Sequence, residues 1–215
     1  MITIHRYDPP SAYTWDIVIQ GMRNSWESWN KSDSYTEYPY NIIEYEPVFM
    51  FGNADKELAA RLTKAGTDHG KYLRQLPIVI EFTAPEYFLK EFDTYKISTT
   101  VNRTSMMHTL GKEPFNASMF SWENLPEYVQ ADLLHMLNDL RLEWIDAGRR
   151  KGPQADAWRA LIQAVPQSWN YRSVWSGNYQ NLRHMYHARK AHRLKEWRDF
   201  CSWVEALPYA ELITA

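Results

Sequence analysis

The sequence is poor in the residues and motifs on which several large classes of protein depend. It has 8 glycines in 215 residues, and it contains neither a glycine-rich phosphate loop nor a Gly-x-Ser-x-Gly segment. We therefore expect neither a dinucleotide-binding fold of the Rossmann type, nor a P-loop nucleotide hydrolase, nor a serine hydrolase.

Cysteine and long apolar segments are also scarce. The single cysteine, Cys201, has no partner for an internal disulfide, which favours a reducing compartment. No apolar run approaches the length that spans a bilayer, and the N-terminal residues 1–5 lack the pattern of a signal peptide. These absences predict a cytoplasmic protein that is not embedded in a membrane.

Charge of one sign is not in excess. A formal net charge of −2 gives the whole chain no drive toward nucleic acid or an anionic membrane. The histidines at 184, 187 and 192 do not follow a zinc-ligand spacing with acidic partners, and no His-Glu-x-x-His segment occurs. We therefore expect no metal site.

Aromatic residues are abundant, with 10 Trp and 14 Tyr. Such side chains combine a large apolar area with a polar tip, so they are common at interfaces and around planar ligands. A tryptophan-rich core explains them equally well. Apolar residues make up 45% and charged residues 23%, which are ordinary globular values. Because no segment resembles a flexible linker, we expect one domain over residues 1–215.

Hydrophobic periodicity predicts a mixture of strands and helices, hence an α+β fold. Strands are expected at 2–4 and 76–82, and helices from 11, over 53–66, 85–92 and 126–147, through 158–162, and from about 176 onward. The polar and aromatic segment 26–45 is expected to be a loop. The hydroxyl-rich segment 97–105 is expected to be either a turn or a ligand-binding loop.

The strongest local signal is a basic stretch in the last of these helices. Its members are Arg183, His184, His187, Arg189, Lys190, His192, Arg193, Lys195 and Arg198. Most of them fit a solvated helix face. Helical spacing, however, places Arg189 and Arg193 on the apolar stripe. A buried guanidinium needs a partner, which could be a carboxylate such as Glu81 or Glu91, or a phosphate, uracil or flavin oxygen.

Two blocks of sequence resemble the flavin-dependent thymidylate synthase family. The first holds His69, the strand 76–82, Thr94-Tyr95-Lys96 in the place of an Arg-His-Arg signature, and Asn102-Arg103-Thr104-Ser105 in the place of Asn-Glu-x-Ser. The second runs from Val165-Pro166 to the pair Asn178 and Arg189, which stand eleven residues apart as in the family's C-terminal helix. Order and spacing together carry the resemblance, over roughly 68–108 and 165–207.

The resemblance implies an antiparallel sheet with long helices packed on it, and a homotetramer whose sites lie between subunits. It implies flavin-dependent methyl transfer to a pyrimidine deoxynucleotide such as dUMP, with FAD as cofactor and with NADPH and methylenetetrahydrofolate if the chemistry is retained. The residues it assigns are Ser105 and Arg189 for catalysis, His69, Tyr95, Lys96, Asn102, Asn178 and Arg193 for the cofactor, and Arg103, His108 and Arg189 for the substrate.

The chain also departs from the family pattern. Only one cation remains in the signature segment, Arg103 replaces a glutamate, and the arginine expected before Leu-Pro falls near Ile162. Losing charged phosphate contacts of about 1.5 to 3 kcal/mol each weakens nucleotide binding unless other groups replace them. The alternative is therefore a non-catalytic homologue that binds or sequesters a nucleotide or flavin. A nucleic-acid module built on the basic stretch ranks last, because the rest of the chain is acidic.

Overall fold

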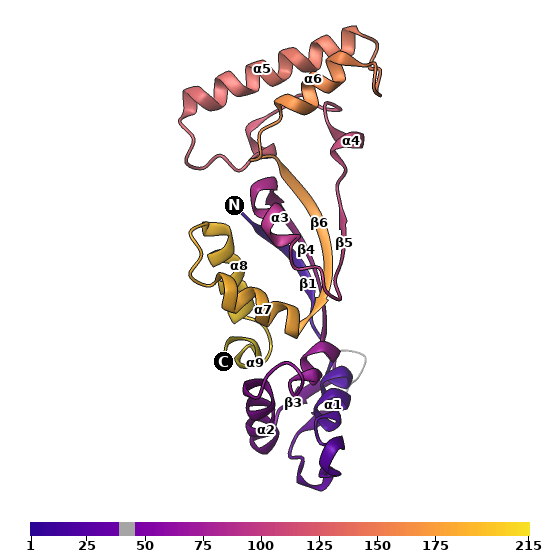
Figure 1. Cartoon of the computed structure of the whole chain (residues 1–215), viewed down its shortest axis with the longest axis vertical. Helices are drawn as coiled ribbons and strands as arrows, with labels where there is room; N and C mark the ends of the chain where they lie inside the picture. The colour runs from indigo at the N-terminus through magenta and orange to yellow at the C-terminus, as the bar shows by residue number, and fades with distance from the viewer. Residues whose placement is uncertain (39–45) are drawn as a thin grey trace. The chain divides into compact units, whose positions relative to one another are not determined.

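The computed structural model describes residues 1–38 and 46–215, and it confirms the predicted α+β fold with an antiparallel sheet. A four-stranded sheet has the order β1 (Thr3–Asp8), β4 (Pro77–Pro85), β6 (Asn170–Asn178) and β5 (Thr100–Arg103) (Figure 1). A separate antiparallel pair is formed by β2 (Tyr35–Glu37) and β3 (Val48–Met50).

The chain divides into two compact units, each assembled from distant segments. The first unit comprises residues 1–5, 81–94 and 101–174, and the second comprises 6–80, 95–100 and 175–215. The boundaries fall within β1, β4, β5 (Thr100–Arg103) and β6, and between residues 94 and 95. Each unit is described by itself below, and the expectation of a single domain stays a prediction.

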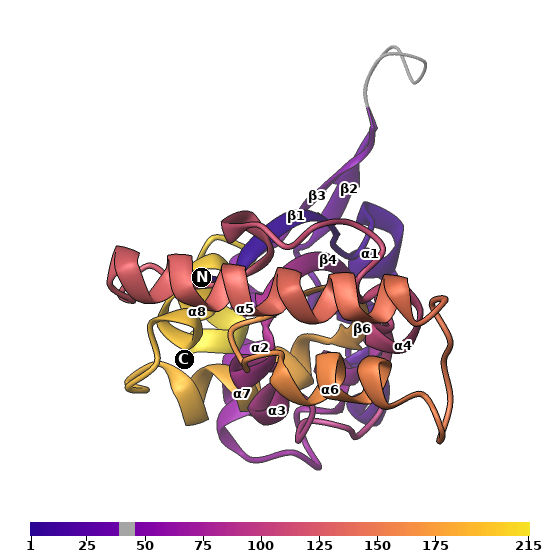
Figure 2. The ribbon, with the colours of Figure 1, turned by 90° about the horizontal axis from the view of Figure 1, so that it is seen from above.

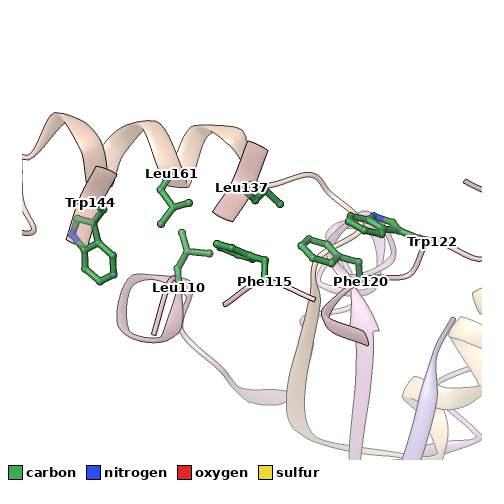
Figure 3. Packing of buried hydrophobic residues seen from close by; sticks show 7 residues of the cluster. All are labelled: Leu110, Phe115, Phe120, Trp122, Leu137, Trp144 and Leu161. Carbon is green, nitrogen blue, oxygen red and sulfur yellow. The ribbon is translucent and has the colours of Figure 1, made fainter. Parts of the chain in front are cut away.

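The first unit contains α3 (Glu86–Phe92), α4 (Met106–Thr109), η4 (Ala117–Met119), α5 (Glu127–Asp146) and α6 (Asp156–Ala164). Helices α5 and α6 lie side by side (Figures 1 and 2). Their facing side chains form one buried cluster with the segment that precedes them (Figure 3), made of Leu110, Phe115, Phe120, Trp122, Leu137, Trp144 and Leu161. The helix predicted over 126–147 therefore supplies the core residues Leu137 and Trp144, because residues seven apart return to the same helix face.

The second unit contains the remaining helices. They are α1 (Ala12–Gly21), η1 (Asn24–Trp26), η2 (Trp29–Lys31), α2 (Asn53–Lys64), η3 (Lys71–Gln75), α7 (Tyr179–Arg189), α8 (Lys195–Glu205) and α9 (Glu211–Thr214). An aromatic core packs α1 against β3, α7 and the segment before α9. The indole of Trp15 stacks on Phe49, with ring centroids 6.1 Å apart, and meets Tyr179 and Tyr209 edge-on. Several of the abundant aromatic residues are thus core residues.

Some predicted boundaries were wrong. The segment 97–105 contains strand β5, and the helix expected from Ser176 begins only at Tyr179, because β6 continues to Asn178. Within the expected loop 26–45, residues 29–31 and 35–37 form η2 and β2, while residues 39–45 lie outside the described chain. Helix α2, which was expected over 53–66, spans Asn53–Lys64 and has Gly52 as its N-cap.

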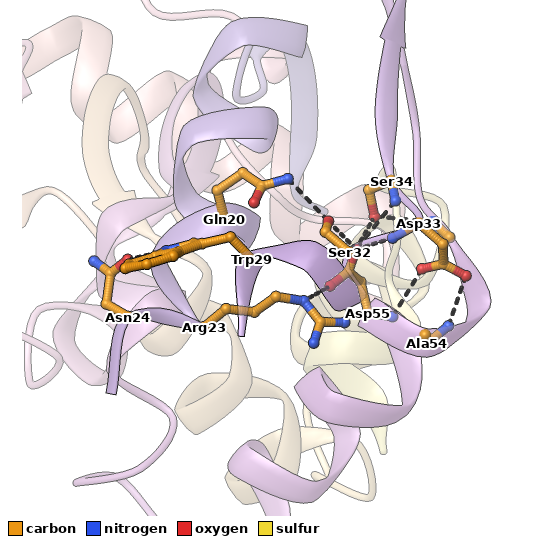
Figure 4. A network of polar contacts seen from close by, with 10 residues as sticks. Gln20, Arg23, Asn24, Trp29, Ser32, Asp33, Ser34, Ala54 and Asp55 are labelled. Atoms are coloured by element: carbon orange, nitrogen blue, oxygen red, sulfur yellow. Dashed lines mark hydrogen bonds and ion pairs between the residues drawn. The ribbon is translucent and has the colours of Figure 1, made fainter. Parts of the chain in front are cut away.

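A buried polar network holds residues 32–34 against the start of α2 (Figure 4). Asp55, which is fully buried, accepts a bond of 2.7 Å from the Arg23 guanidinium and bonds of 2.7 Å from the hydroxyls of Ser32 and Ser34. In return, Asp33 accepts the backbone N–H of Ala54 and Asp55 at 2.9 and 3.1 Å. These bonds satisfy N–H groups that the first turn of a helix leaves without partners.

Candidate functional site

Arg189 stands at the last residue of α7, where its guanidinium is half-buried among aromatic rings. Its Nε–H donates to the hydroxyl of Tyr95 at 2.8 Å, and its Cζ lies 4.9 Å from the centre of the Trp197 ring. The edge of His184 meets Tyr95 with centroids 5.5 Å apart. These residues and His192 are called the Arg189 cluster below. A cation held against aromatic faces keeps its charge while losing part of its hydration.

His192 contacts two hydrogen-bond donors at once. One nitrogen of the Arg189 guanidinium lies 3.0 Å from Nε2 of His192, and the backbone N–H of Leu194 lies 3.2 Å from its Nδ1. Both partners can only donate, whereas a neutral imidazole has a single acceptor nitrogen. A neutral ring therefore accepts only one of these two bonds at a time.

The expectation that Arg193 lies on the apolar face was wrong. Helix α7 ends at Arg189 and α8 begins at Lys195, so the helical spacing that linked 189 to 193 does not apply. Arg193 is exposed in the connecting segment. Its carbonyl and that of His192 accept hydrogen bonds from the Arg198 guanidinium at 3.0 and 2.8 Å, which satisfies backbone acceptors in this connection. Its assignment to the cofactor stays a prediction.

Asn178 has a structural role in this fold. Its side-chain oxygen accepts the backbone N–H of Asn181 at 3.0 Å. The backbone N–H of Asn178 in turn donates to the side-chain oxygen of Asn181 at 3.0 Å. This capping box starts α7 and thereby sets the position of Arg189 eleven residues later. The Asn181 amide also donates to the carbonyl of Ile97 at 2.8 Å, next to the exposed Lys96. Ligand binding by Asn178 and Lys96 stays a prediction.

His69 lies in the turn after α2 and lines a cavity of about 380 Å³. The wall includes the rings of Trp26 and Tyr72 together with Lys71. An adjoining cavity of about 550 Å³ shares Lys71 and adds Arg74, and no acidic residue is among the described residues of its wall. The two cavities therefore bring aromatic surface together with Lys71 and Arg74 in one part of the second unit, and Asp68 adds a carboxylate to the wall of the first.

The other predicted site residues lie in the first unit. Arg103, on β5, makes a two-pronged ion pair with Asp93, with both N···O distances 2.8 Å, and donates through Nε to Ser173 at 3.0 Å. This pairing neutralises the charge that was predicted to hold a substrate phosphate. A phosphate would have to displace Asp93, so the assignment of Arg103 to the substrate stays a prediction.

Three further predicted residues follow along the same segment. Asn102 is exposed on β5, Ser105 is the half-buried N-cap residue of α4, and His108 is exposed on α4. The carbonyl of Ser105 accepts the backbone N–H of Thr109 at 3.0 Å and its hydroxyl at 2.9 Å, which fixes the start of this short helix. The roles of all three in a site stay predictions.

The sequence did not indicate that Asp93 pairs with Arg103. It also did not indicate that His192 and Trp197 contact Arg189. The spacing of three residues from Arg189 to His192 was a usable signal, although the helix ends between them. Asp93 directly precedes the segment that aligns with the family signature.

Among the described residues, no group of three or more His, Cys, Asp or Glu side chains could hold a metal ion, and no helix is both long and apolar enough to cross a membrane.

Comparison with known proteins gives structural likeness without a matching sequence. No protein-family model matches this chain, and none of the curated proteins matches it in sequence. Among solved structures, thymidylate synthase X (ThyX) from Helicobacter pylori with FAD and dUMP superimposes with a TM-score of 0.68 and 22% identity, over 99% of this chain and 95% of that one. A second structure of the flavin-dependent enzyme from the same organism, complexed with FAD and dUMP, gives 0.66 and 21% over 99% and 97%.

The likeness covers nearly the full length of both chains, and identity of about one residue in five supports a conclusion about fold alone. The resemblance inferred from the sequence is confirmed at that level. The chain has the fold of the flavin-dependent thymidylate synthases.

Proposed function

We propose that this protein binds FAD and a pyrimidine deoxynucleotide, and that it transfers a one-carbon group to the base in a thymidylate-synthase-like reaction. The observation that carries the proposal is the guanidinium of Arg189, half-buried between Tyr95 and Trp197. A planar donor fork in a partly dehydrated site matches the paired oxygens of a uracil or a phosphate. The solved structures of the same fold contain FAD and dUMP.

The cavities of the second unit suit a flavin nucleotide. A flat ring can pack on exposed indole, and Trp26 is 64% exposed beside His69. Phosphates need donors and positive charge, and Lys71 and Arg74 line the adjoining cavity. We propose His69, Trp26, Lys71 and Arg74 as cofactor-binding residues on this basis.

When bound, reduced FAD would supply the hydride that converts a methylene group from methylenetetrahydrofolate into a methyl group on the base, and NADPH would reduce the flavin again. Arg189 would orient the base and polarise a carbonyl. The protein's cysteine is a poor nucleophile for this chemistry, because burial raises the pKa of Cys201 to about 11. Activation of the base by hydrogen bonding, without a covalent enzyme adduct, is therefore the route that the residues favour.

A non-catalytic nucleotide or flavin binder is the second candidate. The ion pair of Arg103 with Asp93 favours it, since a neutralised arginine offers less to a phosphate. Thr94-Tyr95-Lys96, in the place of the family's Arg-His-Arg, points the same way.

Spectroscopy and turnover distinguish the two candidates. We expect the purified protein, supplied with FAD, to retain flavin in a one-to-one ratio after gel filtration. The enzyme reading predicts oxidation of NADPH and formation of methylated nucleotide from dUMP and methylenetetrahydrofolate. The binder reading predicts thermal stabilisation by dUMP without product, by about 2.7 kcal/mol at a hundredfold its dissociation constant. Failure to retain flavin and to respond to dUMP would contradict both.

We also propose a cytoplasmic homotetramer, on the basis of the family resemblance. Exposed aromatic residues such as Tyr13, Trp26, Trp29 and Tyr128 are compatible with subunit contacts.

A further inference from the structure

A cavity of about 400 Å³ in the first unit contains none of the residues assigned above to flavin or nucleotide. It lies where β4 and β6 meet the segment from α4 to η4. Its wall includes Thr83, Lys112, Met119, Trp169 and Arg172. A cavity of this size accommodates a compact organic ligand.

The inner wall of the cavity offers a flat apolar surface. Trp169 is half-buried and its ring is fixed by edge-on contacts with Phe115 and Phe120, at centroid distances of 5.8 and 5.3 Å. Met119, also half-buried, stands in the same wall. A rigid indole beside a polarisable thioether favours an aromatic ring as the guest.

The outer wall carries two cations and one acid. Arg172 lines the cavity and pairs through Nε with Glu81 at 2.8 Å, which fixes the guanidinium. In the described part of the chain, no hydrogen bond or ion pair engages the amino group of Lys112. Among the described residues of the wall, Glu113 is the only acidic one. The described lining residues thus include two cations and one carboxylate, and because Glu81 offsets the charge of Arg172, Lys112 is the cation without an ion-pair partner in the described part of the chain.

The hydroxyl groups of the wall are already engaged. Thr104 donates to the carbonyl of Arg172 at 2.9 Å, Thr109 donates to the carbonyl of Ser105 at 2.9 Å, and Ser118 donates to Asn116 at 2.6 Å. The groups left to select a ligand are thus the cations and the aromatic floor, because hydroxyls with partners gain little from a new one.

We propose that this cavity is a second binding site, for an aromatic anion whose ring lies against Trp169 and Met119 and whose carboxylate or phosphate is held by Lys112 and Arg172. Both anions share the oxygen acceptors that such cations bind, and a ring of one or two fused cycles fits the volume. The described wall of this cavity shares no residue with the Arg189 cluster.

Three fluorescent naphthalene probes test this proposal by equilibrium dialysis against the full chain. They are 1-naphthoate, 1-naphthyl phosphate and the uncharged 1-naphthalenemethanol. We expect one site per chain for at least one of the two anions and binding about tenfold or more weaker for the alcohol, because a charged hydrogen bond is lost. Comparing the two anions shows whether the carboxylate or the phosphate is preferred. Equal binding of the alcohol, or no binding of either anion, would overturn the proposal.

Variants separate the cavity from other surfaces. Lys112→Met should weaken the anions about tenfold and leave the alcohol unchanged, while Ser118→Trp, which fills the cavity, should weaken all three probes. The matched control Lys90→Met removes an exposed lysine on α3 of the same unit and should change nothing. Arg189→Ala should also leave probe binding unchanged. Anion binding that survives both Lys112→Met and Ser118→Trp, or that disappears in Arg189→Ala, would refute the site.

Discussion

Tyr95 holds Arg189 through a hydroxyl and a ring at once, and these two contacts can be separated by mutation. The hydroxyl accepts the Nε–H bond at 2.8 Å, and the ring centre lies 5.6 Å from the guanidinium carbon. The bond fixes the direction of the donor fork before a ligand arrives, which lowers the ordering cost of binding.

Tyr95→Phe should therefore weaken dUMP binding about threefold to tenfold, because one of the contacts that orient the guanidinium is lost. Calorimetry on the flavin-loaded protein measures this change. Tyr186→Phe is the matched control, because Tyr186 lies on the same helix as Arg189 but its hydroxyl donates to Glu205 at 2.7 Å. Unchanged or tighter binding in Tyr95→Phe would show that the hydroxyl does not prepare the site.

Asp55 shows how a buried charge depends on its partners. Burial alone raises the pKa of its carboxyl, but hydrogen bonds from Ser34 and Ser32 and the contact with Arg23 outweigh burial, and the pKa is lowered from 3.8. Since the unfolded chain binds the proton more readily than the folded one, the stability contributed by ionised Asp55 is present above the unfolded pKa. It is lost as pH falls through the folded pKa.

Asp55→Asn should lower the free energy of unfolding at pH 7 by about 3 to 5 kcal/mol, because it leaves the Arg23 guanidinium buried without a counter-charge. The variant should also lose less stability than the native protein on acidification below about pH 4. Urea titrations at several pH values test both statements. Parallel pH profiles for the two proteins would contradict the role given to this carboxylate.

At the scale of elements, the link from α4 to α5 depends on a glycine. Gly111 has a φ of +72°, and a Cβ atom there would lie 2.9 Å from the Trp144 ring. Gly148, which follows α5, also has a positive φ of +76°, but a Cβ atom there would meet nothing within 4 Å. The two positions thus share the backbone strain and differ in the space available.

Gly148→Ala should cost about 1 kcal/mol through backbone strain alone, whereas Gly111→Ala should cost about 1 to 3 kcal/mol more through overpacking against Trp144. Thermal unfolding of the two variants, side by side, measures the difference. Equal losses would mean that the cluster in Figure 3 yields easily at this point.

Element boundaries show where the sequence was informative. Helix α1 was predicted from Ser11, which does cap it by accepting the N–H of Thr14 at 3.2 Å. Strand β6 was missed because its inward face includes Ser173, a buried polar residue, and so lacks apolar alternation. The break between α7 and α8 was missed because neither Gly nor Pro marks it in the sequence. In the structure, the backbone N–H of Leu194 donates to the His192 side chain in this break.

At the scale of the whole molecule, the order and spacing of the quoted motifs were sufficient to predict the fold, and the superposition with ThyX confirms it. The site was less predictable. Arg189 was identified by its place on an apolar stripe. The ion pair of Arg103 with Asp93 was not predicted, because Arg103 lies on strand β5, which was not predicted, and its partner is ten positions away in the sequence. Contacts of this kind depend on tertiary structure and leave no periodic pattern.

The homotetramer is a further prediction at this scale. Sedimentation equilibrium of the flavin-loaded protein should give four times the chain mass of 25.5 kDa. A monomer under conditions where flavin and dUMP bind fully would contradict sites shared between subunits.

The proposed nucleotide site depends most on Arg189, and calorimetric titration of dUMP into the flavin-loaded protein tests this dependence directly. We expect Arg189→Ala to weaken dUMP by about tenfold or more, the loss of a charged hydrogen bond of about 1.5 to 3 kcal/mol, while Arg193→Ala, four residues away and exposed, retains native affinity. Native affinity in Arg189→Ala, or an equal loss in both variants, would contradict the nucleotide site proposed here.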